Sequence, residues 1–193
     1  KGRDVDGLCQ PMTANLKIGG VDVARLRAHI RSHPEDFNIR DLTSLDRSSR
    51  LSMAGFYKAW REAVESGAVA VPREDVLLFE TARPNEVIVN TTRVIRMDAT
   101  DPWQLSEAER IGRRQAQQVF DFLRAHAPGF ENAAFLSTGV QIGIRESRRL
   151  QGRYVLTAED LLASKPFEDA IACGGYPIDI HNPTGAKTFT THL

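Results

Sequence analysis

The sequence predicts an α+β fold, in which a mainly antiparallel or mixed sheet is flanked by helices. Three observations support this class: segments with apolar residues at three- and four-residue spacing, shorter segments with alternating apolar residues, and two of the latter joined by a tight turn. Helical and strand segments are intermixed with hairpins, whereas a parallel sheet requires a regular alternation of strand and helix. One core of ordinary size is expected, because 193 residues lie within the usual range for a single domain.

The first part of the chain is predicted to form one strand and two helices. An alternating pattern covers residues 7–18 and stops at Gly19 and Gly20, and a helix follows over residues 21–30. A second, longer helix is expected over residues 46–67. It is supported by large apolar side chains that recur at helical spacing, namely Met53, Phe56, Tyr57, Trp60 and Val64.

The central part is predicted to form a hairpin and a long helix. Residues 76–81 and 87–94 have strand patterns and flank a Pro-Asn turn. An Asp-Pro pair at 101–102 and a capping-box pattern at 106–109 open a helix that ends at Pro128.

The last part is predicted to contain shorter elements. A domain is expected over residues 1–181, followed by a flexible tail or linker over residues 182–193, where Pro, Thr and Gly gather. The elements between the long helix and this tail are strands over 133–136, 140–144 and 176–180, and a helix that begins at Thr157.

Composition and charge disfavour several classes of partner. The chain holds 25 Lys and Arg against 25 Asp and Glu, so no general attraction to nucleic acid or anionic lipid is expected. No apolar run approaches the roughly 18 residues of a transmembrane helix, and the first residues do not form a signal peptide. Cys9 and Cys173 lie far apart and outside any CxxC motif, which favours a reducing, cytoplasmic location.

The sequence contains no fingerprint for a nucleotide cofactor or a metal. It has neither a G-x-G-x-x-G turn nor a Walker phosphate loop, so the residues by themselves indicate no site for FAD, NAD or ATP. His29 and His33 have the spacing of a metal-binding pair, but no third ligand lies nearby, and the helix dipole explains two basic residues in a last turn. No metal site is predicted. A self-contained hydrolase is disfavoured too, since a nucleophile elbow, a paired-carboxylate motif and HExxH are all absent.

The densest charged cluster of the chain lies at residues 143–149. In a strand, Arg145 and Arg149 would share one face with Ser147, and guanidinium groups there would suit an anionic substrate. Internal ion pairing, in which Glu146 neutralises the neighbouring arginines, explains the same residues. The residue types leave both interpretations open.

Further polar residues follow this cluster. Asp179 and His181 share a strand face, where an imidazole beside a carboxylate can relay protons. The spacing alone favours the other interpretation, an edge strand with solvated polar groups. No catalytic residue is assigned. The candidate substrate-binding residues are Arg145, Glu146, Arg148, Arg149, Tyr154, Tyr176, Asp179 and His181.

A series of segments together resembles the middle section of a family of bacterial FAD-dependent oxidoreductases. The segments follow one another in the expected order over nearly the whole chain, beginning with residues 2–7 and 18–22. Such an ordered series is more specific than any single motif. The further segments are Val89-Asn90-Thr91-Thr92-Arg93-Val94, Asp98-Ala99-Thr100-Asp101-Pro102, Pro128-Gly129-Phe130-Glu131, Gly143-Ile144-Arg145-Glu146-Ser147-Arg148-Arg149, Tyr154-Val155-Leu156-Thr157 and Tyr176-Pro177-Ile178-Asp179-Ile180-His181.

The resemblance implies a two-domain flavoprotein of which this chain is the substrate or cap domain. In such proteins an N-terminal Gly-rich strand-turn-helix and a C-terminal segment build the FAD site, so FAD is expected in the full-length parent and not on this fragment alone. The parent is expected to transfer hydride between a small organic substrate and FAD.

The expected partners follow from this resemblance. They are the FAD-binding portion of the same parent chain and a small-molecule substrate. An apolar surface facing that portion would also favour self-association. The alternative is a non-enzymatic module that uses residues 145–149 to bind an anionic ligand or a partner protein.

Overall fold

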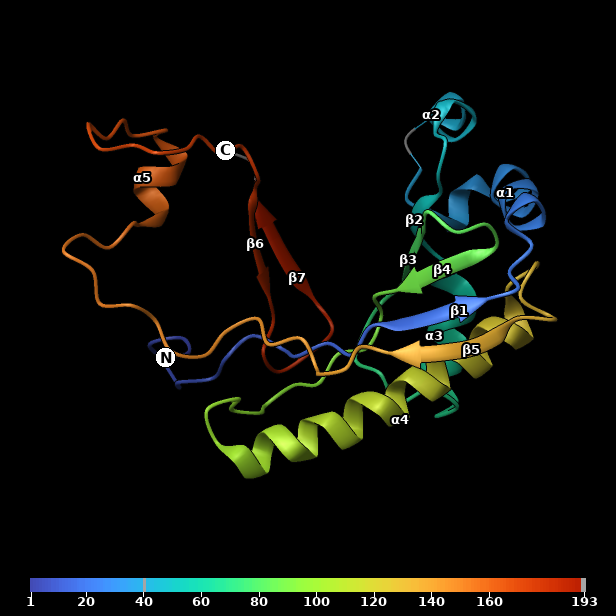
Figure 1. Cartoon of the computed structure of the whole chain (residues 1–193), viewed down its shortest axis with the longest axis horizontal. Coiled ribbons are helices and arrows are strands. Elements are labelled where there is room, and N and C mark those ends of the chain that lie inside the picture. Colours follow the sequence, from blue (N-terminus) through green and yellow to red (C-terminus); the bar gives the residue numbers. More distant parts are fainter. Residues whose placement is uncertain (40, 192–193) are drawn as a thin grey trace.

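The computed structural model describes residues 1–39 and 41–191, and it confirms the α+β class. Its centre is an antiparallel five-stranded sheet with the strand order β2-β3-β4-β1-β5 (Figure 1). A separate antiparallel pair, β6 and β7, forms a hairpin to one side. The strands are β1 (Leu16–Gly19), β2 (Ser52–Gly55), β3 (Val76–Glu80), β4 (Glu86–Val89), β5 (Ala134–Thr138), β6 (Ile178–His181) and β7 (Thr188–Thr191).

Helices cover one face of the five-stranded sheet. Buried side chains of α1, α3 and α4 join those of the strands in one core, and Figure 1 shows α4 running lengthwise below the strands. In the part of the chain that the structure describes, no helix combines the length and apolar character needed to cross a membrane. The helices are α1 (Val23–Ser32), η1 (Pro34–Asp36, a 3-10 turn), α2 (Leu42–Arg47), α3 (Tyr57–Glu65), α4 (Pro102–His126) and α5 (Ala158–Leu162).

The main core is built from alternating strand residues and aromatic helix residues. Leu16 and Ile18 of β1 are buried, and the residue between them is not, as expected for a strand with one covered face. Trp60 of α3 is fully buried and packs edge-on against Phe122 of α4, with 4.9 Å between the ring centroids. The Trp60 indole N–H donates to the carbonyl oxygen of Arg73 at 2.8 Å. This bond ties the core to the chain just before β3.

A smaller second core lies under the first half of α4. There the helix crosses the extended chain very closely at Gly112, where an added Cβ would lie 3.0 Å from Ala14 Cβ and 3.1 Å from Ile142 Cδ1. A side chain at this position would crowd Ala14 and Ile142, so the close approach of the helix favours glycine. The buried members of this cluster are Met12, Ala14, Val94, Ala108 and Ile142.

Most predicted elements are confirmed with shifted ends. The hairpin forms as β3 and β4, the strand over 133–136 as β5, and the strand over 176–180 as β6. Helix α5 carries the expected cap at Thr157. Helix α4 begins at Pro102, because the Asp101 carboxylate accepts from the N–H groups of Trp103 and Gln104 and so satisfies the first turn.

The prediction of one helix over residues 46–67 is wrong in its first half. That part contains strand β2, and α3 begins only at Tyr57. Phe56 separates the two elements with φ at 62°, in the left-handed region, so the chain turns sharply there. Met53 reaches the core from the strand and Trp60 from the helix. Because the seven-residue separation of Met53 and Trp60 corresponds to about two helical turns, their spacing in the sequence resembles that of a single helix.

Side-chain hydrogen bonds explain where two predicted strands differ from the structure. The strand expected over 87–94 ends at Val89, since the Thr91 hydroxyl accepts from the N–H of Leu77 at 3.0 Å in place of a backbone carbonyl. The strand expected over 140–144 does not form, because the N–H of Ile142 donates to the Glu109 carboxylate of α4 at 2.7 Å.

The segment predicted as a tail contains regular structure in its described part. Residues 182–187 form the turn between β6 and β7, and Pro183 in it is buried. The prediction that a domain boundary lies near residue 181 stays a prediction.

Two leucines with opposite exposure test the core. Leu123 of α4 is fully buried, whereas Leu150 is 94% exposed. We expect Leu123→Ala to lower the free energy of unfolding by about 2–5 kcal/mol and Leu150→Ala to change it by less than about 0.5 kcal/mol. Urea denaturation followed by circular dichroism measures both values. Equal losses for the two variants would contradict the packing of α4 on the sheet.

Candidate functional site

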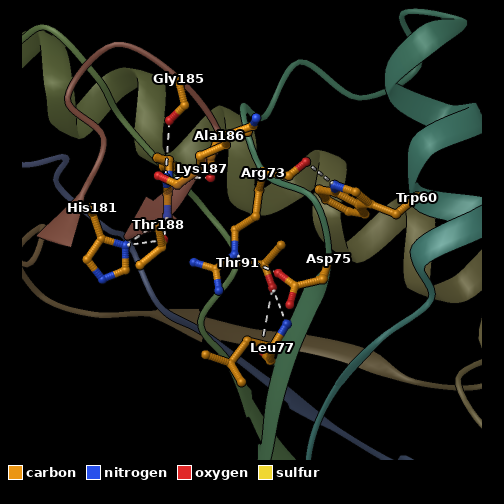
Figure 2. Close-up of polar contacts among 11 residues, drawn as sticks. Trp60, Arg73, Asp75, Leu77, Thr91, His181, Gly185, Ala186, Lys187 and Thr188 are labelled. Atoms are coloured by element: carbon orange, nitrogen blue, oxygen red, sulfur yellow. Dashed lines mark hydrogen bonds and ion pairs between the residues drawn. The ribbon is translucent and has the colours of Figure 1, made fainter. Parts of the chain in front are cut away.

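A cavity of about 550 Å³ lies between the β6–β7 hairpin and the residues around the start of β3. Figure 2 shows His181, Thr188 and the turn residues of the hairpin on one side of this region, and Arg73 and Asp75 on the other. Arg73 and Asp75 form an ion pair with 3.1 Å between Nε and Oδ1. The titratable side chains that line the cavity are Tyr57, Arg73, Glu74, Asp75, Arg93, Asp179 and His181.

Arg93 is held in this site by its own backbone. It lies in the extended segment after β4, where its N–H donates to Gln115 Oε1 at 2.8 Å and its carbonyl accepts from Gln115 Nε2 at 3.0 Å. Gln115 is a buried residue of α4, so helix and strand segment are fastened together at this point. Arg93 is only 2% exposed.

The guanidinium of Arg93 reaches from this anchor into the β6–β7 hairpin. Burial, reinforced by the charges of Arg73 and Arg145, lowers its pKa to about 10, so it remains a cation at neutral pH. Its hydrogen bonds within the hairpin go from Nη1 to the carbonyls of Gly185 (3.1 Å), Ala186 (2.7 Å) and Lys187 (3.1 Å), and from Nη2 to Thr188 Oγ1 (2.9 Å) and His181 Nδ1 (2.8 Å).

His181 is neutral in this environment. Burial, followed by the charges of Arg145 and Arg93, lowers its pKa to about 4, although the charge of Asp179 acts in the opposite direction. Its Nε2 lies 3.6 Å from Asp179 Oδ2. The structure therefore brings the two predicted residues of β6 together on one face, at the wall of the cavity.

Arg145 adds positive charge beside the cavity without lining it. Its Nη1 donates to Thr13 Oγ1 at 2.7 Å and to the carbonyl of Pro11 at 3.1 Å. Burial, together with the charge of Arg73, lowers the pKa of Arg145, and the charge of Asp179 opposes this. The predicted strand face that would carry Arg145 does not form, because residues 145–149 have no regular secondary structure.

Glu146 and Arg149 form an ion pair, as one of the two interpretations of this segment expects. The Glu146 carboxylate accepts from Arg149 at 3.2 Å and from the N–H of Gln10 at 2.9 Å. Both residues line a second hollow of about 310 Å³, which His181 also borders. Arg148 is exposed and lines neither cavity.

The two predicted tyrosines lie elsewhere. Tyr154 is exposed, and its hydroxyl donates to Asp160 at 2.6 Å and accepts from Lys165 at 2.7 Å, near helix α5. Tyr176 is exposed just before β6. Neither lines the cavity.

Neither Arg73 nor Arg93 is among the substrate-binding residues predicted from the sequence. Arg93 stood only in the segment Val89-Asn90-Thr91-Thr92-Arg93-Val94 that carried the family resemblance. An arginine inside a strand-like, β-branched run is unusual for a buried position, because a buried charge requires dedicated partners. That mismatch is the signal that could have found it.

Comparison with known protein families decides the relationship of the chain. The model of a family described as FAD dependent oxidoreductase matches residues 1–193. The chain belongs to this family. No curated protein and no solved structure matches it.

One segment of this FAD-dependent oxidoreductase chain can be compared with a dinucleotide-binding turn, and its geometry differs from such a turn. The described segment closest to a dinucleotide turn is β1, Gly19-Gly20 and α1. Its strand pairs antiparallel on both sides, whereas a dinucleotide-binding turn belongs to a parallel βαβ unit. The start of α1 is already capped by the Asp22 carboxylate, which accepts from the N–H of Arg25 at 2.9 Å and would repel a phosphate.

The described residues also provide no set of metal ligands. His29 and His33 lie with their ring centroids 4.5 Å apart, and burial lowers the pKa of His29. Among residues 1–39 and 41–191, no group of three or more His, Cys, Asp or Glu side chains is placed to hold an ion.

The stability of the chain should fall as the pH drops from about 6.5 to about 4. Unfolded His181 has a pKa of about 6.5, whereas the folded residue has a pKa of about 4. Between these values the unfolded state binds a proton that the folded state does not, so acid favours unfolding. After allowance for the partial exposure of the ring, the expected loss is about 1–3 kcal/mol.

Urea denaturation at both ends of this pH window measures the effect. His181→Gln should remove this part of the pH dependence, and His33→Gln, which changes an exposed histidine, should retain it. An unchanged pH dependence in His181→Gln would show that His181 titrates normally.

Proposed function

We propose that the chain is the substrate-side domain of an FAD-dependent oxidoreductase and that the cavity beside the β6–β7 hairpin receives the substrate. The carrying observation is the buried Arg93 guanidinium at this cavity, next to a histidine whose pKa is lowered to about 4. Buried charges are costly, and strongly shifted pKa values gather at functional sites. Seven titratable side chains line this cavity, and Arg93 among them is almost fully buried.

The parent enzyme would transfer hydride between a small organic substrate and FAD. FAD supplies the redox chemistry when it is bound by another part of the parent. The residues of this chain would bind and orient the substrate: Asp179 and His181 at the wall of the cavity, with the positive charge of Arg145 behind them.

Exposed apolar side chains support a covering partner. Several of them lie in the second half of the sequence, between residues 140 and 189. Apolar patches of this kind mark interaction surfaces. The FAD-binding portion of the same parent is the proposed partner, and the same surface favours self-association of the isolated chain. Examples, each more than 60% exposed, are Val140, Leu150, Val155, Ile171, Tyr176 and Phe189.

The alternative of a non-enzymatic module has less support. It requires residues 145–149 to present cations to a ligand, but Arg145 points into the protein and Arg149 is paired with Glu146. Only Arg148 of the three arginines lies exposed outside both hollows.

Steady-state kinetics of the full-length parent test the substrate site. Asp179→Asn should lower kcat/KM by about tenfold or more, because a lost hydrogen bond to a charged group costs about 1.5–3 kcal/mol. Flavin content and melting temperature should stay near those of the wild type. Asp121→Asn, at an exposed carboxylate of α4, is the matched control and should leave kcat/KM unchanged. Wild-type kinetics in Asp179→Asn would refute this site.

Cofactor binding is tested on the chain itself. Residues 1–193 mixed with FAD and then dialysed should remain colourless, because the capped start of α1 and the antiparallel sheet offer no diphosphate site. Visible absorbance spectroscopy measures bound flavin. Stoichiometric FAD after dialysis would contradict the proposed division of roles within the parent.

A further inference from the structure

We propose that Arg93 is a positioning residue that holds His181 in the tautomer with its hydrogen on Nε2, and that His181 and Asp179 together bind a hydroxyl group of the substrate. This inference rests on the proposed function, since it takes the cavity as the substrate site. It adds the kind of chemical group that the site recognises.

The neighbours of His181 determine which of its ring nitrogens carries the hydrogen. A guanidinium has only donors, so the 2.8 Å contact from Arg93 Nη2 makes His181 Nδ1 an acceptor. Thr188 Oγ1 lies 3.1 Å from the same nitrogen and already accepts from Arg93, so its hydroxyl hydrogen is free to point at Nδ1. With donors on this side, the ring hydrogen of neutral His181 must lie on Nε2.

The terminal nitrogens of Arg93 are already hydrogen-bonded within the chain. Nη1 is engaged by three carbonyls of the turn at residues 185–187, and Nη2 by His181 and Thr188. Both terminal nitrogens are therefore used within the chain. Arg93 consequently fixes the hairpin and the histidine and does not grip the substrate itself. Gln115 holds the backbone of Arg93 from α4, which makes this support rigid.

His181 and Asp179 offer one donor and one acceptor at the wall of the cavity. His181 Nε2–H is a donor and Asp179 is an acceptor, both line the cavity, and 3.6 Å separates them, which exceeds a normal hydrogen bond. A hydroxyl oxygen can accept from the first and donate to the second. A carboxylate has no hydrogen for Asp179, and an ammonium has no lone pair for Nε2–H.

The charges of the cavity favour the same conclusion. Glu74 and Asp75 line it together with Asp179, and Arg73 is paired with Asp75. The arginines around His181 are therefore already bonded to groups of the chain itself. An anionic ligand in the cavity would be repelled by the carboxylates that line it. The fitting substrate class is an uncharged alcohol or polyol.

Nuclear magnetic resonance of the ¹⁵N-labelled chain tests the tautomer. Two-bond ¹H–¹⁵N correlations should show His181 protonated at Nε2 in the wild type. Arg93→Met, which removes every donor, should produce a mixture of tautomers and raise the pKa of His181 toward its usual value. Arg73→Gln is the matched control: it removes a cavity arginine without a bond to His181 and should leave the tautomer unchanged. An Nδ1-protonated wild type would overturn the proposal even if Arg93→Met failed to fold.

Two small probes test the hydroxyl assignment on the same labelled chain. Glycerol, added up to molar concentration, should shift the ring signals of His181, and Asp179→Ala should weaken this shift at least severalfold. Acetate should shift them less than glycerol does. A response to acetate alone, or none to glycerol, would overturn the hydroxyl assignment. The proposed function would survive either result if Asp179→Asn still lowered kcat/KM in the parent, and it would fail separately if kinetics were unchanged.

Discussion

The β6–β7 hairpin depends on one buried cation, the guanidinium of Arg93. A two-stranded hairpin such as β6–β7 is marginal in water by itself and needs another element to hold it. Arg93 provides this support by donating to three consecutive carbonyls of its turn and to two of its side chains. A guanidinium this deeply buried is tolerated because its terminal donors have acceptors. The same contacts place β6 beside the main sheet and so create the cavity.

The support for Arg93 extends into the helical layer. Gln115 of α4 makes two hydrogen bonds to the Arg93 backbone, and Thr92 next to it exchanges two with the backbone of Ala14. The segment after β4 thus leaves the regular ladder but keeps its backbone groups satisfied. Helix α4 can lie close enough for these bonds because Gly112, one turn earlier, has no side chain. Core packing and site geometry are in this way linked through one helix.

The sequence predicted the features that depend on neighbouring residues. Helices α1 and α4 and the β3–β4 hairpin follow from local spacing and turn residues, and Asp179 and His181 share a face because they lie two apart in a strand. Strand β2 was missed, because Met53 and Trp60 meet in one core from different elements. Arg93 was missed because its partners lie about 90 positions away along the chain, and no local pattern records such a contact.

The balance of charge explains why a neutral imidazole belongs in this cavity. Arg93 and Arg145 disfavour a proton on His181, while Asp179 favours one only weakly at 3.6 Å. An imidazolium would also place an N–H against the Arg93 donor, so protonation would break the bond that fixes the ring. The ring is therefore a constant donor at neutral pH, and Asp179 remains the acceptor beside it. In an oxidoreductase that removes hydride from an alcohol carbon, the hydroxyl proton must go to an acceptor, and a carboxylate held near the substrate oxygen meets that requirement. In the proposed site, His181 would orient the substrate hydroxyl and Asp179 would accept its proton, while Arg93 holds the His181 ring in place.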